Sequence, residues 1–131
     1  MKLFPHSFFW IFVFAILYPI NIFPTDLCGP ISGTLTFAGS PYIVTCNVLV
    51  PDGQTLSIEP GVIIKFNLEK ILQVDGTLIA EGTAGNEIKF TYNNSVPGGG
   101  DWDEIYFMQS ENSILNYCII EHAGSGASPR T

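Results

Sequence analysis

An internal repeat with a period in the low twenties is the feature that most restricts how this chain can fold. Residues 50–56 read Val-Pro-Asp-Gly-Gln-Thr-Leu, and residues 74–78 read Val-Asp-Gly-Thr-Leu. The run Ile-Lys-Phe at residues 64–66 recurs at residues 88–90. A single coil of this length cannot bury its own apolar face, whereas stacked coils bury a continuous core. The repeat therefore predicts a solenoid.

Between the repeated turns, short runs of apolar and β-branched residues predict strands. Ile64 and Phe66 lie on one side of such a run, and Lys65 lies on the other. Alternation with a period of two is typical of strands that are buried on one face. We expect strands over residues 42–50, 62–66, 77–80 and 87–92.

One segment also fits a short helix. Leu68 and Leu72 follow Ile64 at helical spacing, so a single helical turn is the alternative to a strand there. We favour the strand because Gly61 and Gly76 lie close together in the sequence. The segment between them gives little room for a helix beside the preceding strand.

Residues 1–25 differ in composition from the rest of the chain. They contain seventeen apolar residues and no glycine. Met1-Lys2 precedes an apolar stretch from Phe8 to Ile20, the order found in secretory signals. These thirteen positions are fewer than the about 20 that a membrane-spanning helix needs. We expect residues 1–25 to be a cleaved signal peptide and residues 26–131 to be the folded domain, with an uncleaved anchor or a buried apolar segment as alternatives for the former.

Charge and composition exclude two broad classes of protein. The chain has a net charge of −7, and its basic residues are almost limited to Lys65, Lys70 and Lys89. Nucleic-acid binding needs clustered Lys and Arg to contact phosphates, so we expect no nucleic-acid partner. A hydrophobic content of 47% also excludes a disordered chain.

Three cysteines are too few for a disulfide framework. In an oxidising compartment Cys28 could pair with Cys46. For Cys46 as well as for Cys118 we favour a small buried hydrophobic residue, because Cys46 shares its strand parity with Val44 and Cys118 shares its parity with Ile114 and Ile120. A lipid-modified Cys28 is disfavoured by the large residue before it. No spacing of Cys and His indicates zinc.

Several motifs together resemble a known family. They are Glu-Pro-Gly-Val-Ile-Ile-Lys-Phe at residues 59–66, Val-Asp-Gly-Thr-Leu-Ile-Ala-Glu-Gly-Thr at residues 74–83 and Gly-Asp-Trp-Asp-Glu-Ile-Tyr-Phe at residues 100–107. Over residues 31–126 the chain resembles the right-handed parallel β-helix proteins of bacterial envelopes. The resemblance implies an all-β, single-stranded parallel β-helix. At about 22 residues per coil, residues 26–131 would form four to five coils.

The carboxy-terminal part of the chain departs from that family. We expect Pro-Gly-Gly-Gly at residues 97–100 to form a protruding loop, after which residues 105–107 (Ile-Tyr-Phe) start a third, out-of-phase copy of the repeat. Members of the family run longer, whereas this sequence stops at Thr131, and no capping helix is evident after Tyr117. An uncovered last coil exposes its apolar end. We therefore expect a fragment of a longer protein, self-association through this end, or marginal stability.

An acidic cluster is the one candidate for metal binding. Asp101, Asp103 and Glu104 follow the glycine-rich segment, and calcium favours carboxylates on a flexible turn. The cluster does not match the calcium-loop pattern, which has a glycine at its sixth position and a glutamate at its twelfth. We expect a solvated loop beside Trp102, with the indole packed inward, and we assign no metal site.

No catalytic group is expected in the chain. Glu121 and His122 are the one acid and imidazole pair, but neighbouring residues of a strand point to opposite faces. Lys65 and Lys89 take equivalent positions of the Ile-Lys-Phe repeat, so we expect a solvated ladder on an outer face. Residues 124–126 (Gly-Ser-Gly) form a flexible turn and not a nucleophile elbow.

These observations predict a non-catalytic protein without cofactor, secreted or held at the cell envelope or outer surface. Its expected role is that of an adhesin-like structural spacer or a binding surface for carbohydrate or a surface protein. Contact with a membrane is expected only through residues 1–25. The alternative is a degenerate or truncated polysaccharide lyase or hydrolase of the β-helix type, and a small β-sandwich binding module is a third interpretation.

Overall fold

The computed structural model describes residues 23–95 and 101–124. Within these residues the protein is all-β, with no α-helix and one short 3₁₀ turn, η1 (Phe37–Gly39). The strands are β1 (Thr25–Pro30), β2 (Gly33–Leu35), β3 (Tyr42–Val50), β4 (Thr55–Ile58), β5 (Ile63–Phe66), β6 (Leu72–Val74), β7 (Thr77–Glu81), β8 (Ile88–Tyr92), β9 (Ile105–Phe107), β10 (Ile114–Asn116) and β11 (Cys118–Ile120).

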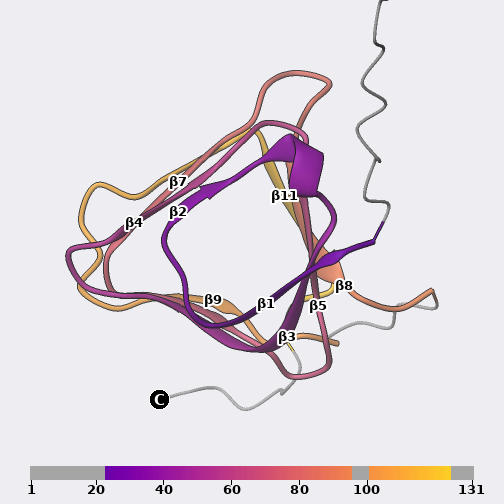
Figure 1. Cartoon of the computed structure of the whole chain (residues 1–131), viewed down its shortest axis with the longest axis horizontal. Helices are drawn as coiled ribbons and strands as arrows, with labels where there is room; N and C mark the ends of the chain where they lie inside the picture. The colour runs from indigo at the N-terminus through magenta and orange to yellow at the C-terminus, as the bar shows by residue number, and fades with distance from the viewer. Residues whose placement is uncertain (1–22, 96–100, 125–131) are drawn as a thin grey trace, which may run out of the picture.

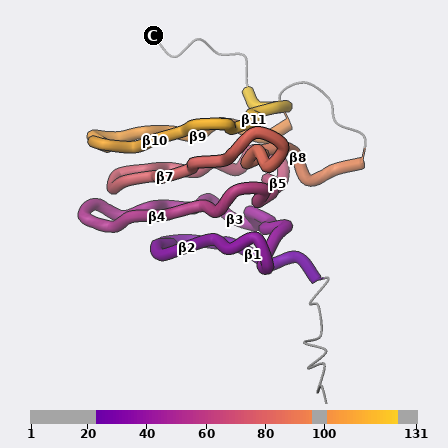
Figure 2. The backbone as a smooth tube through the Cα atoms, turned by 90° about the horizontal axis from the view of Figure 1, so that it is seen from above, coloured from indigo at the N-terminus to yellow at the C-terminus, as the bar shows by residue number. Residues whose placement is uncertain are grey.

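All pairs between these strands are parallel and join segments distant in the sequence. One sheet has the order β11-β8-β5-β3-β6-β9, with β1 paired to β3, and the other has the order β10-β7-β4-β2. Figure 2 shows the chain in layers that lie one above another. Viewed along the stack, successive layers nearly superimpose around a shared interior (Figure 1). Parallel strands need long connections, which here run around each layer.

The larger sheet curls because β3 turns a corner within its own length. The first part of β3, residues 42–44, pairs with β5. Its last part, residues 48–50, pairs with β6. The bend at residues 45–47 therefore divides the strand between two faces of the same sheet, and a row of turns continues this corner in the layers above.

The predicted strands are confirmed over residues 42–50, 62–66, 77–80 and 87–92, with ends that differ by at most one position. The segment after Phe66, for which a single helical turn was the alternative, forms a turn that is followed by β6. Leu68, whose spacing suggested a helical stripe, is 55% exposed. Glu69 has a φ of 60°, which is incompatible with a continuing helix. The strand was thus the correct choice, although β6 is short.

The predicted repeat is right at the turns and wrong at one strand. Leu56 pairs with Leu78, as the repeat of the turns predicts. Ile64, however, pairs with Phe90 and not with Ile88, so the expected alignment of the two Ile-Lys-Phe runs is wrong by two positions. A shift of two keeps the same side chains pointing inward, because the side-chain period of a strand is two. The hydrophobic pattern therefore could not detect it.

The expected third copy of the Ile-Lys-Phe run is also wrong. Strand β9 pairs with β6, with Ile105 beside Leu72. The row that contains β5 and β8 continues instead in β11, where Ile120 lies beside Phe90. The expected protruding loop at residues 97–100 lies outside the described residues.

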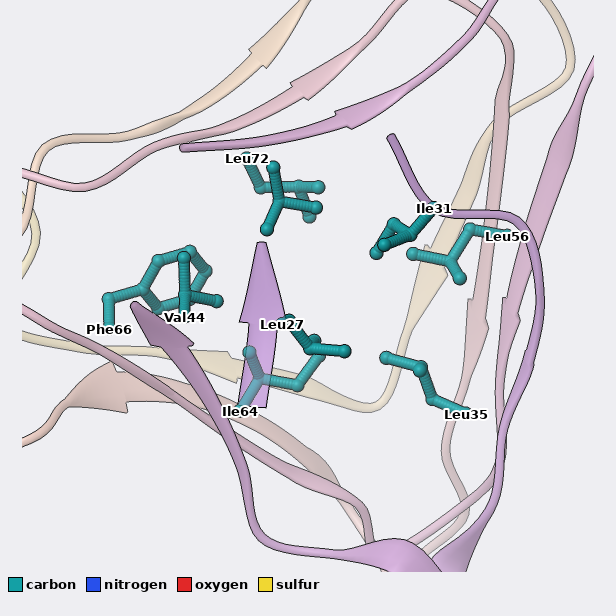
Figure 3. A pocket seen from close by; sticks show the side chains of 9 residues that line it. Leu27, Ile31, Leu35, Val44, Leu56, Ile64, Phe66 and Leu72 are labelled. Carbon is teal, nitrogen blue, oxygen red and sulfur yellow. The ribbon is translucent and has the colours of Figure 1, made fainter. Parts of the chain in front are cut away.

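The interior is filled by the inward-facing residues of the stacked strands. Phe66, Val74, Leu78 and Phe90 are each 0% exposed. Near the first layer the apolar side chains converge on a space of only about 10 Å³, which is no larger than one water molecule occupies. Figure 3 shows Leu27 and other side chains pointing into this space. This part of the interior is therefore packed too closely to hold a ligand.

Gly76 is required for close contact between two stacked turns. A Cβ atom at this position would overlap the carbonyl oxygens of Pro51 and Gln54, which are backbone atoms that cannot rotate away. We expect Gly76→Ala to lower the free energy of unfolding by about 2 kcal/mol or more, as overpacking typically does. Urea unfolding followed by circular dichroism measures this change.

Gly53 supplies the matched control, because it occupies the turn one layer below. Its φ is +73°, and a Cβ atom added there would meet no other atom within 4 Å. Gly53→Ala should therefore lower stability by only about 1 kcal/mol, through backbone strain. Equal losses at the two glycines would show that the turns do not stack as described.

Residues 1–22 lie outside the described residues, and so does most of the segment expected to be a signal peptide. The first strand, β1, begins at Thr25 and pairs with β3. In the part of the chain that the structure describes, no helix is long and apolar enough to cross a membrane.

Candidate functional site

A polar groove of about 250 Å³ lies along one row of stacked turns. The turn after β3 contributes Asp52, the turn between β6 and β7 contributes Asp75, and the loop between β9 and β10 contributes Glu111. Backbone stacking therefore brings together three carboxylates from segments that are far apart in the sequence. The full lining is Asp52, Gly53, Asp75, Gly76, Thr77, Gln109, Glu111 and Asn112.

Hydrogen bonds hold the upper wall of this groove onto the layer below. Ser110 donates from Oγ to the carbonyl oxygen of Gly76 at 2.7 Å. The backbone N–H of Leu78 donates to Oγ of Ser113 at 2.9 Å. Oδ1 of Asp75 accepts a hydrogen bond from Nε2 of Gln73 at 2.8 Å, which fixes the direction of that carboxylate. The groove is thus preorganised.

The chemistry of the groove suits hydroxyl groups better than anions. Carboxylate and amide oxygens accept hydrogen bonds, and the amides of Gln109 and Asn112 also donate them. None of the described residues that line the groove is basic, so its carboxylates would repel a negatively charged ligand. The sequence predicted the Pro-Asp-Gly and Asp-Gly turns but not the groove. The loop at residues 108–113 has no counterpart in the repeat that would place it beside them.

The acidic residues considered for calcium lie on a corner and not in this groove. The backbone N–H of Asp101 donates to the carbonyl oxygen of His122, and the N–H of Asp103 donates to that of Lys70. These bonds seat the segment against the neighbouring corner turns. One carboxylate oxygen of Asp101 is buried without a hydrogen-bond partner among the described residues. Across residues 23–95 and 101–124, no group of three or more His, Cys, Asp or Glu side chains is arranged to hold a metal ion.

The expectation that Trp102 packs inward is confirmed. Its side chain is 0% exposed. The indole stacks on the ring of Phe66, with 4.1 Å between ring centroids and an interplanar angle of 11°. Its Nε1–H donates to the carbonyl oxygen of Glu121 at 2.7 Å. Trp102 thus closes the interior at a corner between strands.

Glu121 and His122 follow the end of β11 (Cys118–Ile120) at a corner turn. Oε1 of Glu121 accepts a hydrogen bond from Oγ1 of Thr91 at 2.9 Å and lies 3.8 Å from Nζ of Lys89. His122 has a φ of 60°, and its carbonyl oxygen accepts the N–H bonds of Asp101 and Trp102. Both residues therefore have structural contacts at a corner turn. Ser125 and Gly126, two residues of the expected flexible turn, lie outside the described residues.

The expected lysine ladder is wrong in its register. Lys65 pairs with Thr91, and Lys89 pairs with Ile63. The two lysines are offset by two positions because successive layers differ in length at their corners. Lys89 instead forms the ion pair with Glu121, and the partners' side chains are 39% and 38% exposed. A pair this exposed contributes little to stability.

A disulfide joins Cys28 of β1 to Cys46 of β3, a pairing that the sequence left open. The favoured interpretation of Cys46 as a small buried hydrophobic residue is wrong. Leu27 pairs with Val44 and Gly29 with Val48, so β3 carries two more residues than β1 at the bend. That bend removes Cys46 from the alternation of its neighbours and directs it to Cys28.

Cys118 is a free, half-buried thiol. Its Sγ donates to the carbonyl oxygen of Ala80 at 3.3 Å, and burial raises its pKa. The thiol therefore stays protonated at neutral pH and is a weak nucleophile. The expected shared parity with Ile114 fails because Tyr117, with a φ of 49°, interrupts the strand between them.

No protein-family model, no curated protein and no solved structure matches the chain.

Proposed function

We propose that the chain forms a right-handed single-stranded parallel β-helix of four to five coils. The support is the number of strands in each row of the stack. The row β1-β3-β5-β8-β11 has five strands. The row β1-β3-β6-β9 and the row β2-β4-β7-β10 have four strands each. Each coil then consists of three short strands and three corners. Right-handed winding follows from the strong preference of parallel strand connections for that hand.

The function that this geometry supports best is a non-catalytic, rigid spacer that presents a contact surface outside the cytoplasm. The observation that carries the proposal is the stack of parallel rows over a filled core, because it gives a stiff body with fixed side-chain positions. The disulfide between Cys28 and Cys46 is consistent with an oxidising compartment, such as the cell envelope or the medium. The apolar composition of residues 1–25 supports export by a signal peptide.

For the contact surface we propose the polar groove, with neutral carbohydrate as its ligand. Sugar hydroxyls both donate and accept hydrogen bonds, which matches the mixture of carboxylates and amides in the groove. The net charge of −7 and the carboxylates of Asp52, Asp75 and Glu111 disfavour acidic polysaccharides. A rigid groove loses little conformational entropy when it binds.

A titration with neutral hexasaccharides tests the groove. We expect cellohexaose, maltohexaose or chitohexaose to shift the amide resonances of Gln109, Asn112 and their neighbours in nuclear magnetic resonance spectra. Asp52→Ala with Glu111→Ala should weaken the binding at least about 10-fold, since hydrogen bonds to charged groups contribute about 1.5–3 kcal/mol each.

The matched control removes two carboxylates beside the turn between β7 and β8, as Glu81→Ala with Glu87→Ala, and should bind like the unchanged protein. The groove assignment fails if no hexasaccharide shifts these resonances, or if both double variants weaken binding equally. The non-catalytic assignment is tested separately, by incubating the purified protein with polygalacturonate and alginate. Release of oligosaccharides from either would show an enzyme of the β-helix type instead.

A further inference from the structure

The three turns that line the polar groove differ in length. The turn between β3 and β4 has four residues, 51–54, and the loop between β9 and β10 has six, 108–113. The turn between them in the stack, from β6 to β7, has only two residues, Asp75 and Gly76. A short turn reaches less far from the core than a longer one. The middle turn is therefore set back, and the groove is a notch between two longer turns.

The notch runs across the stack and not along it. Figure 2 shows the turn before β7 ending short of the turns before β4 and β10, which lie in the neighbouring layers. The floor and the two walls come from different layers, and their residues are Asp75, Gly76 and Thr77 for the floor, Asp52 and Gly53 for the lower wall, and Gln109, Glu111 and Asn112 for the upper wall. The walls block both directions along the stack. A ligand longer than the notch must therefore leave it along the middle layer.

Hydrogen bonds fix both walls relative to the floor. The backbone N–H of Thr77 donates to the carbonyl oxygen of Gln54 in the lower turn at 2.9 Å. Oγ1 of Thr77 donates to the carbonyl oxygen of Glu111 in the upper loop at 3.3 Å. The walls belong to layers two steps apart, so their backbones lie about 10 Å from each other, at about 4.8 Å per layer. Van der Waals contacts of about 3.5–4 Å reduce this width to about 6 Å, which admits one sugar chain and not two.

The notch is also short. Its floor covers three residues of the middle layer, or about 10 Å at about 3.3 Å per residue, which is the length of roughly two sugar rings. Its volume of about 250 Å³ lies below the roughly 300–1,000 Å³ of pockets that enclose a whole small molecule. Figure 1 shows that the faces with β9 and β7 both fall away from this corner. A straight chain therefore contacts the protein only within the notch.

We propose that the notch binds an internal segment of a straight, unbranched and unsubstituted β-1,4-linked glucan, which crosses the axis of the stack. About two sugars contact the protein, and the rest of the chain extends into solvent on both sides. This inference rests on the proposed carbohydrate binding, for which it specifies the linkage and the direction of the chain. The protein then holds a polysaccharide strand at a right angle to its own stack.

The shape and the chemistry of the notch select this kind of chain. Parallel walls admit a straight chain, whereas an α-1,4-linked chain curves towards one wall as it leaves the notch. A branch or an N-acetyl group widens the chain beyond the space between the walls. The carboxylates of Asp52, Asp75 and Glu111 accept hydrogen bonds from sugar hydroxyls and repel acidic sugars.

Titrations with oligosaccharides of different length and linkage test the shape of the notch. We expect cellohexaose to bind at most about 5-fold more tightly than cellobiose, because it presents five overlapping disaccharides but makes no new contacts. Reduction of its terminal sugar to the alditol should leave binding unchanged, because the notch is open at both ends. Maltohexaose, chitohexaose and a branched xyloglucan oligosaccharide should bind at least about 10-fold more weakly than cellohexaose.

Two tryptophan variants test the direction of the chain. Thr77→Trp fills the floor of the notch and should weaken cellohexaose binding at least about 30-fold. The matched control is Thr55→Trp, because Thr55 pairs with Thr77 one layer below and does not line the notch. It should bind like the unchanged protein, whereas it would block a chain that ran along the stack over Thr77. Glu111→Trp obstructs the notch from its exposed upper wall and replaces Thr77→Trp if circular dichroism shows that variant to be unfolded.

Equal weakening by Thr55→Trp and Thr77→Trp would overturn the crossing direction. Maltohexaose or chitohexaose binding as tightly as cellohexaose would overturn the linkage, and a larger gain with chain length would overturn the short contact. These three outcomes leave the binding of neutral carbohydrate in the groove intact. Binding of none of these oligosaccharides would instead overturn the proposed function together with this inference.

Discussion

Replacing Trp102 by alanine should lower the free energy of unfolding by about 3–5 kcal/mol, the range for large aromatic residues in a core. The indole is fully buried, stacks on Phe66 and donates a hydrogen bond to the carbonyl oxygen of Glu121. Its removal leaves a cavity at the corner and an unsatisfied carbonyl group. Since small domains are stable by only about 5–15 kcal/mol, the variant should unfold at a much lower urea concentration.

Two further variants identify the cause of this loss. Trp102→Phe keeps an aromatic ring against Phe66 but removes the N–H donor, so its loss should be intermediate. Leu68→Ala removes a large apolar side chain that is 55% exposed and should cost less than about 1 kcal/mol. A loss below about 1 kcal/mol for Trp102→Ala would contradict the burial of this residue in the interior.

Removing the disulfide should have the second largest effect. For Cys28→Ser with Cys46→Ser we expect a loss of about 3 kcal/mol, because the bond closes a loop between residues 18 positions apart in the unfolded chain. Strand β1 is an edge strand that pairs only with β3, so it has few other restraints. Its amide protons should therefore lose their protection from hydrogen exchange before those of β5 and β8.

Cys118→Ser is the matched control for this prediction. Serine keeps a donor toward the carbonyl oxygen of Ala80, and the residue takes no part in the disulfide. We expect it to cost less than about 1 kcal/mol. If the double variant unfolds at the same urea concentration as the unchanged protein, or if a reducing agent leaves that concentration unchanged, the disulfide does not restrain the first layer.

Local patterns in the sequence predicted the strands because alternation and turn residues act over a few positions. The run at residues 42–50 was predicted with its correct ends, and the turns at Gly53 and Gly76 were placed in successive layers. The pairing of Ile64 with Phe90 was missed by two positions. Register depends on how many residues each corner holds, and corner length leaves no periodic signal in a single sequence.

The functional surfaces were harder to predict for the same reason. The groove combines turns whose repeat is visible, around Asp52 and Asp75, with a loop around Glu111 that has no counterpart in the repeat. Residues 105–107 were assigned to the wrong row, so the pairing of β9 with β6 was not predicted. Only the observed pairing places Ile114 and Ile119 in the same layer.

Hydrogen-bond scalar couplings in nuclear magnetic resonance spectra test the parallel stacking most directly. One row of the stack contains three successive bonds, from the N–H of Asn67 to the carbonyl of Val44, from Asn93 to Phe66 and from Glu121 to Phe90. The proposed parallel β-helix predicts a coupling across each of these three bonds, in one direction only. Couplings exchanged in both directions between opposite residues of neighbouring strands would indicate antiparallel hairpins and would contradict the stacked architecture.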